Sequence, residues 1–243
     1  MYIIYYAIRL IVITMKVSLS FEKTCTKDVS VMVDALRAST SITLALNNFD
    51  EIIPCFTPEE AFELAKENNS LIAGERNGMK IEGFDIGNSP EAIEGFEIPS
   101  DKSRTLILTT RNGTRILEAM ESTVLVGCLL NAKAVAEKAV EIADEEIDVV
   151  MAGVKGSFAL EDFLVCGEIL YWINELCDCE LNDLAKAAIL ASRDYESMKK
   201  GIYASRSGKK LKEIGNLKDV DCCTLKNVSN NVAIYENGKL TLI

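Results

Sequence analysis

Carboxylates and arginines stand side by side at the ends of two apolar runs in this sequence. Asp34 and Arg37 follow one run, and Glu75 and Arg76 follow another. Such pairs suit a site that binds both a divalent cation and an anion, because Mg²⁺ prefers oxygen ligands and guanidinium groups bind oxyanions. A structural salt bridge produces the same pairing, so the pattern by itself leaves both interpretations open.

The stretch 74–90 concentrates these features. It contains glycines at positions 74, 78, 83 and 87, which permit left-handed backbone or close approach of another chain segment. Asp85 adds a further carboxylate, and Asn88 and Ser89 precede Pro90 at a predicted helix start, where Ser89 would cap the helix. We predict a rigid polar loop at the end of a buried strand, which is where α/β proteins place their sites.

Hydroxyl, amide and cationic groups also gather at predicted helix starts, where backbone N–H groups attract phosphate or sulfonate. The candidates for holding such an anion are Asn88, Ser89, Thr110, Asn112, Gly113, Thr114, Arg115 and Arg206. Ordinary helix capping explains any one of these segments taken alone. Their expected convergence at one side of a sheet favours a binding site.

Glu161 and Asp162 open another predicted helix, where acidic residues are favourable for purely structural reasons. They complete the set of carboxylates that are candidates for metal binding. That set is Asp34, Glu75, Asp85, Glu161 and Asp162, of which we expect a subset to bind the ion.

Composition excludes several classes of chemistry. The chain has no histidine, so acid–base steps fall to carboxylates, Lys, Tyr, Cys or water held by a metal. A net charge of −11 argues against nucleic acid or an anionic membrane as partner. P-loop and nucleophile-elbow motifs are missing. Eight cysteines without a CxxC pair indicate a reduced, cytoplasmic protein, with Cys128 part of the core rather than a nucleophile.

Apolar strand-like runs alternate with helix-like segments from residue 29 to residue 176. This alternation predicts an α/β fold with a mainly parallel sheet and helices on both faces. In such a sheet the polar segments after the strands share one edge and form one crevice. Beyond residue 178 we expect a C-terminal helical elaboration, with one helix over 182–198, a turn at 205–208 and a terminal β-hairpin around Asn237-Gly238.

Residues 15–243 are predicted to form a single domain, with 178–243 as its elaboration. Residues 1–14 form an apolar extension that is too short for a membrane span and has Arg9 in its middle, so an over-called start is the simplest interpretation. The sequence leaves the oligomeric state open, a homodimer included.

With these segments assembled, the sequence resembles the 2-phosphosulfolactate phosphatase family of coenzyme M biosynthesis, a pathway of archaeal methanogens. The matching stretches are VDALRAST (33–40), GERNGMKIEGFDIGNSPE (74–91), TTRNGTR (109–115), Asn131 and GSFALED (156–162). Two positions near the C-terminus depart from the family pattern, because Asn227 replaces an expected Asp and Ala233 an expected Pro.

The resemblance implies Mg²⁺-dependent hydrolysis of (2R)-O-phospho-3-sulfolactate to (2R)-3-sulfolactate. Asp34, Glu75 and Asp85 would bind the metal or activate water, and Arg37 and Arg76 would hold anionic groups of the substrate. The residues leave open whether water or a carboxylate attacks phosphorus, with water favoured because no phospho-Asp motif is present. Two alternatives remain: a phosphatase of the same fold acting on another small phosphorylated acid, and a non-catalytic phosphate- or sulfonate-binding protein.

Overall fold

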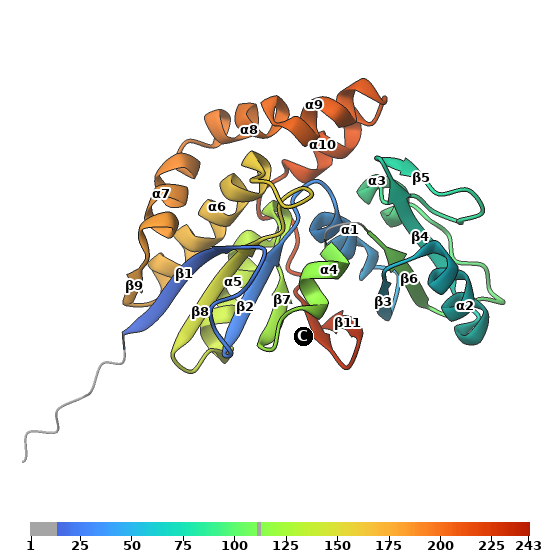
Figure 1. Cartoon of the computed structure of the whole chain (residues 1–243), viewed down its shortest axis with the longest axis horizontal. Helices are drawn as coiled ribbons and strands as arrows, with labels where there is room; N and C mark the ends of the chain where they lie inside the picture. Colours follow the sequence, from blue (N-terminus) through green and yellow to red (C-terminus); the bar gives the residue numbers. More distant parts are fainter. Residues whose placement is uncertain (1–13, 111–112) are drawn as a thin grey trace, which may run out of the picture.

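A computed structural model describes residues 14–110 and 113–243, and within this part eleven strands form one sheet (Figure 1). Their order across the sheet is β5-β4-β6-β3-β11-β10-β7-β2-β8-β1-β9. The strands are β1 (Met15–Phe21), β2 (Val29–Val33), β3 (Glu51–Cys55), β4 (Leu71–Arg76), β5 (Met79–Lys80), β6 (Thr105–Thr109), β7 (Thr123–Val126), β8 (Glu146–Met151), β9 (Cys179–Leu181), β10 (Ala233–Glu236) and β11 (Lys239–Leu242). The predicted α/β class is confirmed.

The helices follow the strands in alternation as far as residue 176. They are α1 (Ala38–Ala45), α2 (Pro58–Asn68), α3 (Pro90–Glu94), α4 (Gly113–Glu118), a 3₁₀ turn (Leu129–Asn131), α5 (Ala132–Ile142) and α6 (Leu160–Leu176). Four more helices form what we call the C-terminal arm: α7 (Asp183–Ser192), α8 (Tyr195–Ala204), α9 (Arg206–Glu213) and α10 (Leu217–Cys223). Figure 1 shows α8, α9 and α10 running along one side of the molecule.

The sheet consists of two parallel groups joined by the C-terminal hairpin. β7, β2, β8, β1 and β9 are parallel to one another, as are β4, β6 and β3. Between the groups lie β10 and β11, which pair antiparallel with each other, with β7 and with β3. Their turn has φ 51° at Asn237 and 79° at Gly238, so the predicted type I′ turn is confirmed.

Three antiparallel ladders separate the two groups, so the groups run in opposite directions and would end at opposite edges of a flat sheet. Each strand pair adds about 20–25° of twist, and over five pairs this turns one group by roughly 100° relative to the other. One apolar cluster joins Met32 of β2 with Ala73 of β4 and Leu108 of β6, so the curved sheet wraps a common core. The strand ends therefore converge as expected. Twist and curvature of the sheet cause this convergence. We had expected the strand ends to share one edge of a parallel sheet, and they do not.

Side chains alternate between the two faces of the sheet, and both faces are covered. Val31 and Val33 of β2 pack in a cluster with residues of α5, α6 and α7. Met32, between them, packs with residues of α1 and α4 on the opposite face. Alternation with a period of two residues buries each strand on both sides, as in parallel α/β sheets. Helices on both faces are thus confirmed.

Three local expectations were wrong. β4 continues through Glu75 and Arg76, because these residues pair with β5 rather than leaving the sheet. The helix expected over 182–198 is two helices, since the Asp194 side chain accepts a hydrogen bond from the Ser197 N–H and caps α8. The expected turn at 205–208 is the first turn of α9, in which Ser205 caps the Gly208 N–H at 3.0 Å.

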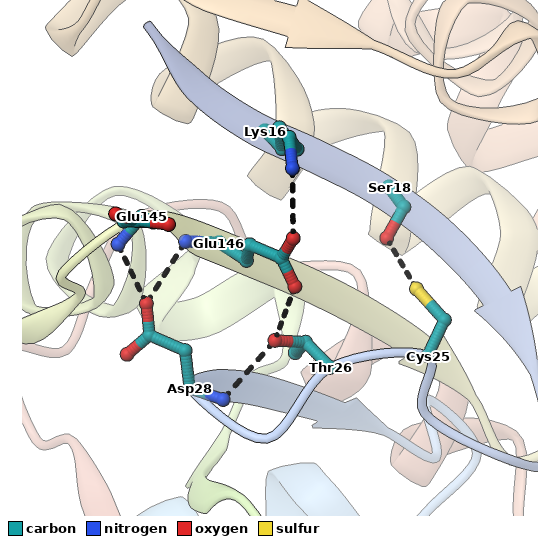
Figure 2. Close-up of polar contacts among 7 residues, drawn as sticks. All are labelled: Lys16, Ser18, Cys25, Thr26, Asp28, Glu145 and Glu146. Carbon is teal, nitrogen blue, oxygen red and sulfur yellow. Dashed lines mark hydrogen bonds and ion pairs between the residues drawn. The ribbon is translucent and has the colours of Figure 1, made fainter. Parts of the chain in front are cut away.

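The amino ends of β1, β2 and β8 are held by a polar network around the carboxylates of Asp28, Glu146 and Asp148. Figure 2 shows contacts of Asp28 and Glu146. Asp28 accepts hydrogen bonds from three consecutive backbone N–H groups, of residues 144–146, at 2.8–2.9 Å. Glu146 accepts from Thr26 and pairs with Lys16. Asp148, fully buried, accepts from Ser18, Thr24 and the Cys25 N–H. We call Asp28, Glu146 and Asp148, with these donors, the amino-end network.

Candidate active site

A cleft of about 110 Å³ opens where four strands end and the C-terminal arm passes over them. Segments that follow or end the strands contribute Asp34 after β2, Glu75 in β4, Thr110 after β6, and Val154 and Lys155 after β8. The remaining lining residues are Leu36, Arg37, Asn77, Gly78, Asn88, Ser207, Lys210 and Leu211. Segments distant in the sequence thus meet in one polar cleft.

Asp34 lies at the base of this cleft, directly after the fully buried strand β2, and is 8 % exposed. The pKa of Asp34 is raised to about 7, chiefly because burial removes water from the carboxylate and also because the charges of Glu75 and Glu161 oppose its ionisation. The Ala38 N–H and the Arg37 charge only partly offset this effect. Asp34 is therefore a carboxyl group short of compensating positive charge.

Glu75 is positioned by the tight turn that joins β4 to β5. Asn77 and Gly78 have φ values of 60° and 88°, and the Gly78 N–H donates to Glu75 Oε2 at 2.5 Å. Gly74, just before, has no room for a side chain, because a Cβ there would lie 2.6 Å from the Thr109 carbonyl oxygen. β4 can thus approach β6 closely enough to bring Glu75 beside Asp34.

Arg37 is held in the cleft by Asp219 of α10. The two side chains form an ion pair in which each is almost fully buried, and Arg37 also donates to the Gly78 carbonyl oxygen at 3.1 Å. The second oxygen of Asp219 accepts from the Ser89 hydroxyl at 2.6 Å. Burial and two fixed contacts leave the guanidinium little freedom, so its free N–H groups have a defined direction.

Asn88 and Thr110 complete the polar lining. Asn88 is 4 % exposed, and its Oδ1 has no hydrogen-bond partner among the described residues. Buried acceptors of this kind are rare in folded proteins and indicate a missing ligand or water. The Thr110 hydroxyl lies 3.4 Å from both the hydroxyl and the N–H of Thr114, at the start of α4. A Cβ at Gly113 would lie 3.6 Å from Asp34 Oδ2, so α4 begins against the carboxylate.

The donor set fits a divalent cation bound mainly through substrate and water. Among the residues that the structure describes, no three His, Cys, Asp or Glu side chains are grouped so as to hold a metal ion by themselves. Mg²⁺ usually takes one or two carboxylates and completes its shell with water and substrate phosphate. Asp34 and Glu75, which oppose each other's charge, and the orphaned Asn88 Oδ1 supply such a set.

Glu161 and Asp162 lie behind the cleft at the start of α6 and do not line it. Asp162 accepts hydrogen bonds from the Ala35 N–H at 2.8 Å and the Gly153 N–H at 2.9 Å. It therefore joins the loops that follow β2 and β8. Burial raises the pKa of Asp162 well above its usual range, and the charges of Asp34 and Glu161 raise it further. The charge of Glu161 increases the negative potential around Asp34.

Other predicted site residues lie outside the cleft. Asp85 is exposed and accepts from the Ile72 N–H at 2.8 Å, near the start of β4. Arg76 donates to the carbonyl oxygens of Glu75 and Phe56. Arg115 pairs with Glu22.

Ser89 and Arg206 lie at the margin of the cleft. Ser89 acts through Asp219, and Arg206 donates to the Val154 carbonyl oxygen at 3.3 Å. Asn112 lies outside the described residues.

Comparison with known proteins assigns the family. Residues 15–238 match the family model described as 2-phosphosulpholactate phosphatase. A 2-phosphosulfolactate phosphatase of Methanothermobacter thermautotrophicus is 44 % identical over 229 residues, 94 % of this chain and 96 % of that protein. The chain belongs to the 2-phosphosulfolactate phosphatase family. This membership makes it an enzyme of the phosphatase class.

Two further relatives from different lineages agree with this assignment. The 2-phosphosulfolactate phosphatase of Methanocaldococcus jannaschii is 37 % identical and covers 89 % of this chain and 92 % of its own length. A probable 2-phosphosulfolactate phosphatase of Clostridium acetobutylicum is 37 % identical and covers 87 % of this chain and 91 % of its own. The family match includes every residue of the cleft. No helix in the described part of the chain is long and apolar enough to span a membrane.

Sequence reasoning missed five residues with polar side chains that line or organise the cleft: Asn77, Lys155, Ser207, Lys210 and Asp219. Asn77 and Ser207 lie inside the segments 74–90 and 205–208, in which neighbouring charged residues were the stronger candidates. Lys155 precedes Gly156 in the segment after β8, which is a detectable turn signal. Asp219 and Lys210 carry no such signal, because acidic and basic residues on amphipathic helices are usually solvated.

Proposed function

We propose that this enzyme hydrolyses (2R)-O-phospho-3-sulfolactate to (2R)-3-sulfolactate and phosphate, and that the reaction requires Mg²⁺. The observation that carries the proposal is one cleft holding the buried Asp34, the adjacent Glu75 and the fixed Arg37. Carboxylates for a cation beside a guanidinium for an oxyanion are the combination that phosphoryl transfer uses. The substrate is the one after which the relatives are named.

Asp34 and Glu75, with the Asn88 carbonyl oxygen, are the residues that would hold the Mg²⁺ ion. When bound, the ion neutralises phosphate charge and acts as a Lewis acid toward the phosphoryl oxygens. Without a cation, Asp34 keeps a proton near neutral pH because its pKa is about 7. A cation beside it would favour the ionised carboxylate, so a raised pKa is the property expected of a carboxyl group that binds a cation.

Arg37 and Thr110 are placed to orient the phosphate. Arg37 cannot turn away, because Asp219 and the Gly78 carbonyl oxygen hold two of its nitrogens. Thr110 offers a hydroxyl at the start of α4. Positioning of this kind, together with charge stabilisation, contributes most of the rate enhancement in phosphoryl transfer. We propose direct attack by water, oriented by groups of the cleft.

We further propose that the reaction is a step of coenzyme M biosynthesis and takes place in the cytoplasm. All eight cysteines have free thiols in the structure, which is compatible with a reducing compartment. Cys128 is buried, and burial raises its thiol pKa, so this residue is unsuited to act as the nucleophile.

Phosphate release from phosphosulfolactate tests the proposal directly. The assay is run with Mg²⁺, with EDTA, and with Mg²⁺ restored after EDTA. We expect release that EDTA abolishes and Mg²⁺ restores. Release that persists after exhaustive chelation would refute the metal requirement. Faster release from another small phosphorylated acid, such as 2-phosphoglycerate, would refute the substrate while leaving the phosphatase class intact.

A further inference from the structure

We propose that Lys155, Ser207 and Lys210 form a subsite that binds the sulfonate of the substrate and thereby sets its specificity. The inference rests on the proposed function, because it assigns one group of that substrate to one side of the cleft. The three residues line the cleft together with Asp34 and Glu75. They come from the loop after β8 and from the C-terminal arm.

Lys155 stands at the tip of a tight turn after β8. Val154 and Ser157 exchange backbone hydrogen bonds of 2.9 and 3.1 Å, and the two residues between them, Lys155 and Gly156, have φ values of 51° and 74°. Two successive positive φ angles define a type I′ turn, in which the central residues project away from the bonded pair. The turn thus fixes the place from which Lys155 reaches the cleft.

Ser207 and Lys210 share one face of α9 with Leu211. Residues three and four apart lie on the same side of a helix, so these three are neighbours on its surface. Leu211 is 5 % exposed and belongs to the core cluster, which orients this face toward the body of the protein. Ser205 caps the helix at the Gly208 N–H. Because α9 is anchored at both points, the backbone positions from which Ser207 and Lys210 reach the cleft are fixed.

Arg206 ties the two elements together. Its guanidinium donates to the Val154 carbonyl oxygen at 3.3 Å, so the first residue of α9 is bound to the turn that carries Lys155. Arg206 therefore supports the subsite from outside, and it does not line the cleft itself. The capping by Ser205 and the hydrogen bond from Arg206 to Val154 explain why the segment 205–208 is polar. Arg206 therefore has a structural role, and we do not assign it to substrate binding.

Charge distribution assigns the sulfonate to this side. The substrate carries a phosphate, a sulfonate and a carboxylate, and Asp34 and Glu75 repel anions that arrive without a cation. The third cation of the cleft, Arg37, is already compensated by Asp219. No acidic side chain of the described residues forms an ion pair with Lys210. Ammonium groups and a hydroxyl suit a sulfonate, whose oxygens accept hydrogen bonds from several directions.

The test compares two substrates that differ only in the sulfonate: phosphosulfolactate and 2-phospholactate, which has hydrogen in its place. For each we measure kcat/KM of the Mg²⁺-loaded wild type, Lys210→Met, Lys155→Met and Ser207→Ala. We expect Lys210→Met to lower kcat/KM for phosphosulfolactate about ten- to a hundredfold, as loss of a charged hydrogen bond does. For 2-phospholactate the change should remain below about threefold. Lys155→Met should follow the same pattern, and Ser207→Ala should follow it more weakly.

The matched control is Lys209→Met, which removes an exposed lysine next to Lys210 that does not line the cleft. We expect it to behave as wild type with both substrates. Binding of 3-sulfolactate, measured by calorimetry in the presence of Mg²⁺, supplies a second readout that does not require turnover. Lys210→Met should weaken this binding, and Lys209→Met should not.

Equal losses with both substrates would overturn the sulfonate assignment and place Lys210 near the phosphate or carboxylate. No loss with either substrate, together with unchanged sulfolactate binding, would overturn the subsite altogether. A wild-type enzyme that hydrolyses 2-phospholactate as well as phosphosulfolactate would refute specificity for the sulfonate. A wild type that hydrolyses neither would instead refute the proposed function, so the two failures are distinguishable.

Discussion

Carboxylates occur in two clusters of this protein that differ in how completely they are compensated. In the amino-end network, Asp148 accepts from two hydroxyls and one N–H. Asp28 accepts from three backbone N–H groups, of which those of Glu145 and Glu146 are drawn in Figure 2. The hydrogen bond from Thr26 and the contact with Lys16 lower the pKa of Glu146. In the cleft, burial and neighbouring carboxylates raise the pKa of Asp34 to about 7.

The difference separates structural from functional use of the same side chain. When protein donors surround a carboxylate, its oxygens have their hydrogen bonds within the fold and are not available to a ligand. Asp34 and Glu75 retain capacity for a cation, and Asn88 beside them has an unused oxygen. Buried carboxylates without compensating charge, and a buried oxygen without a donor, lower the stability of the fold. Their presence in one cleft therefore indicates that a ligand compensates them.

The largest effect that would test this contrast is loss of turnover in Asp34→Asn. The amide keeps the shape of the carboxyl but removes its charge, so kcat should fall by about a thousandfold or more. The unfolding free energy measured in urea should stay equal or rise, because a buried charge is removed. Activity within tenfold of wild type would show that Asp34 belongs with the structural carboxylates.

Asp219→Asn tests whether the buried ion pair between Asp219 and Arg37 affects the rate of the reaction. Arg37 would lose its buried partner, which we expect to lower the unfolding free energy by about 3 kcal/mol and kcat/KM by ten- to a hundredfold. Asp221→Asn, in the same helix, is the control, because Asp221 accepts from Tyr203 at the surface. A stable Asp219→Asn enzyme with normal kcat/KM would mean that Arg37 needs no fixed direction.

Asp148→Asn should reverse the pattern of Asp34→Asn. Three donors would face a side chain that offers one acceptor oxygen, so we expect a loss of about 2–3 kcal/mol in unfolding free energy. Measured per folded molecule, below the unfolding transition, kcat should stay within about twofold, because the network lies at the amino ends of the strands, away from the cleft. A large fall in kcat at full folding would remove the distinction between the two clusters.

Stability should fall with rising pH when the protein is kept in EDTA. The folded protein binds the Asp34 proton with a pKa of about 7, whereas the unfolded chain releases it near 3.8. Between these values the native state holds more protons, so raising the pH favours unfolding, by on the order of 2–4 kcal/mol in total. The raised pKa of Asp162 acts in the same direction.

Urea titrations of the wild type and Asp34→Asn at pH 5 and pH 8 measure this contribution. The pH dependence should be smaller in the variant, and Mg²⁺ should restore wild-type stability at pH 8 because it binds the ionised form. The same slope in both proteins would contradict the assignment to Asp34.

The smallest effect is expected for Lys16→Met in the amino-end network. The side chains of Lys16 and Glu146 are 66 % and 38 % exposed, so water already screens their contact. The urea midpoint and kcat should both equal those of the wild type. A clear loss of stability would show that the network depends on this ion pair more than on its buried hydrogen bonds.

Much of the local structure could be predicted because its causes are local. The mostly apolar run Val29–Val33 forms β2, and Thr57 caps α2 at the start of the segment Thr-Pro-Glu-Glu (57–60), a sequence typical of a helix N-terminus. Ser89 caps α3 with Pro90 at its first position. The predictions failed where a contact with another segment decides the structure, as for β4, whose last residues are strand because β5, three to five residues further along, folds back on them.

The candidate site divides along the same line. Asp34, Arg37, Glu75, Asn88 and Thr110 could be selected by residue type and by their place after buried runs. Asp85 matched the same criteria, yet its carboxylate binds the Ile72 N–H near the start of β4. Residue type and spacing cannot distinguish these cases, because both depend on which backbone N–H groups the fold brings near.

The sequence by itself determined that strands and helices alternate, that residues 233–242 form a type I′ hairpin, and that histidine takes no part in the chemistry. These properties follow from side-chain periodicity, turn chemistry and composition. Only the tertiary structure decided that the hairpin joins two opposed parallel groups and that Arg37 meets Asp219, 182 residues away. Sheet twist and the burial of a shared core bring these distant segments together, and neither can be read from neighbouring residues.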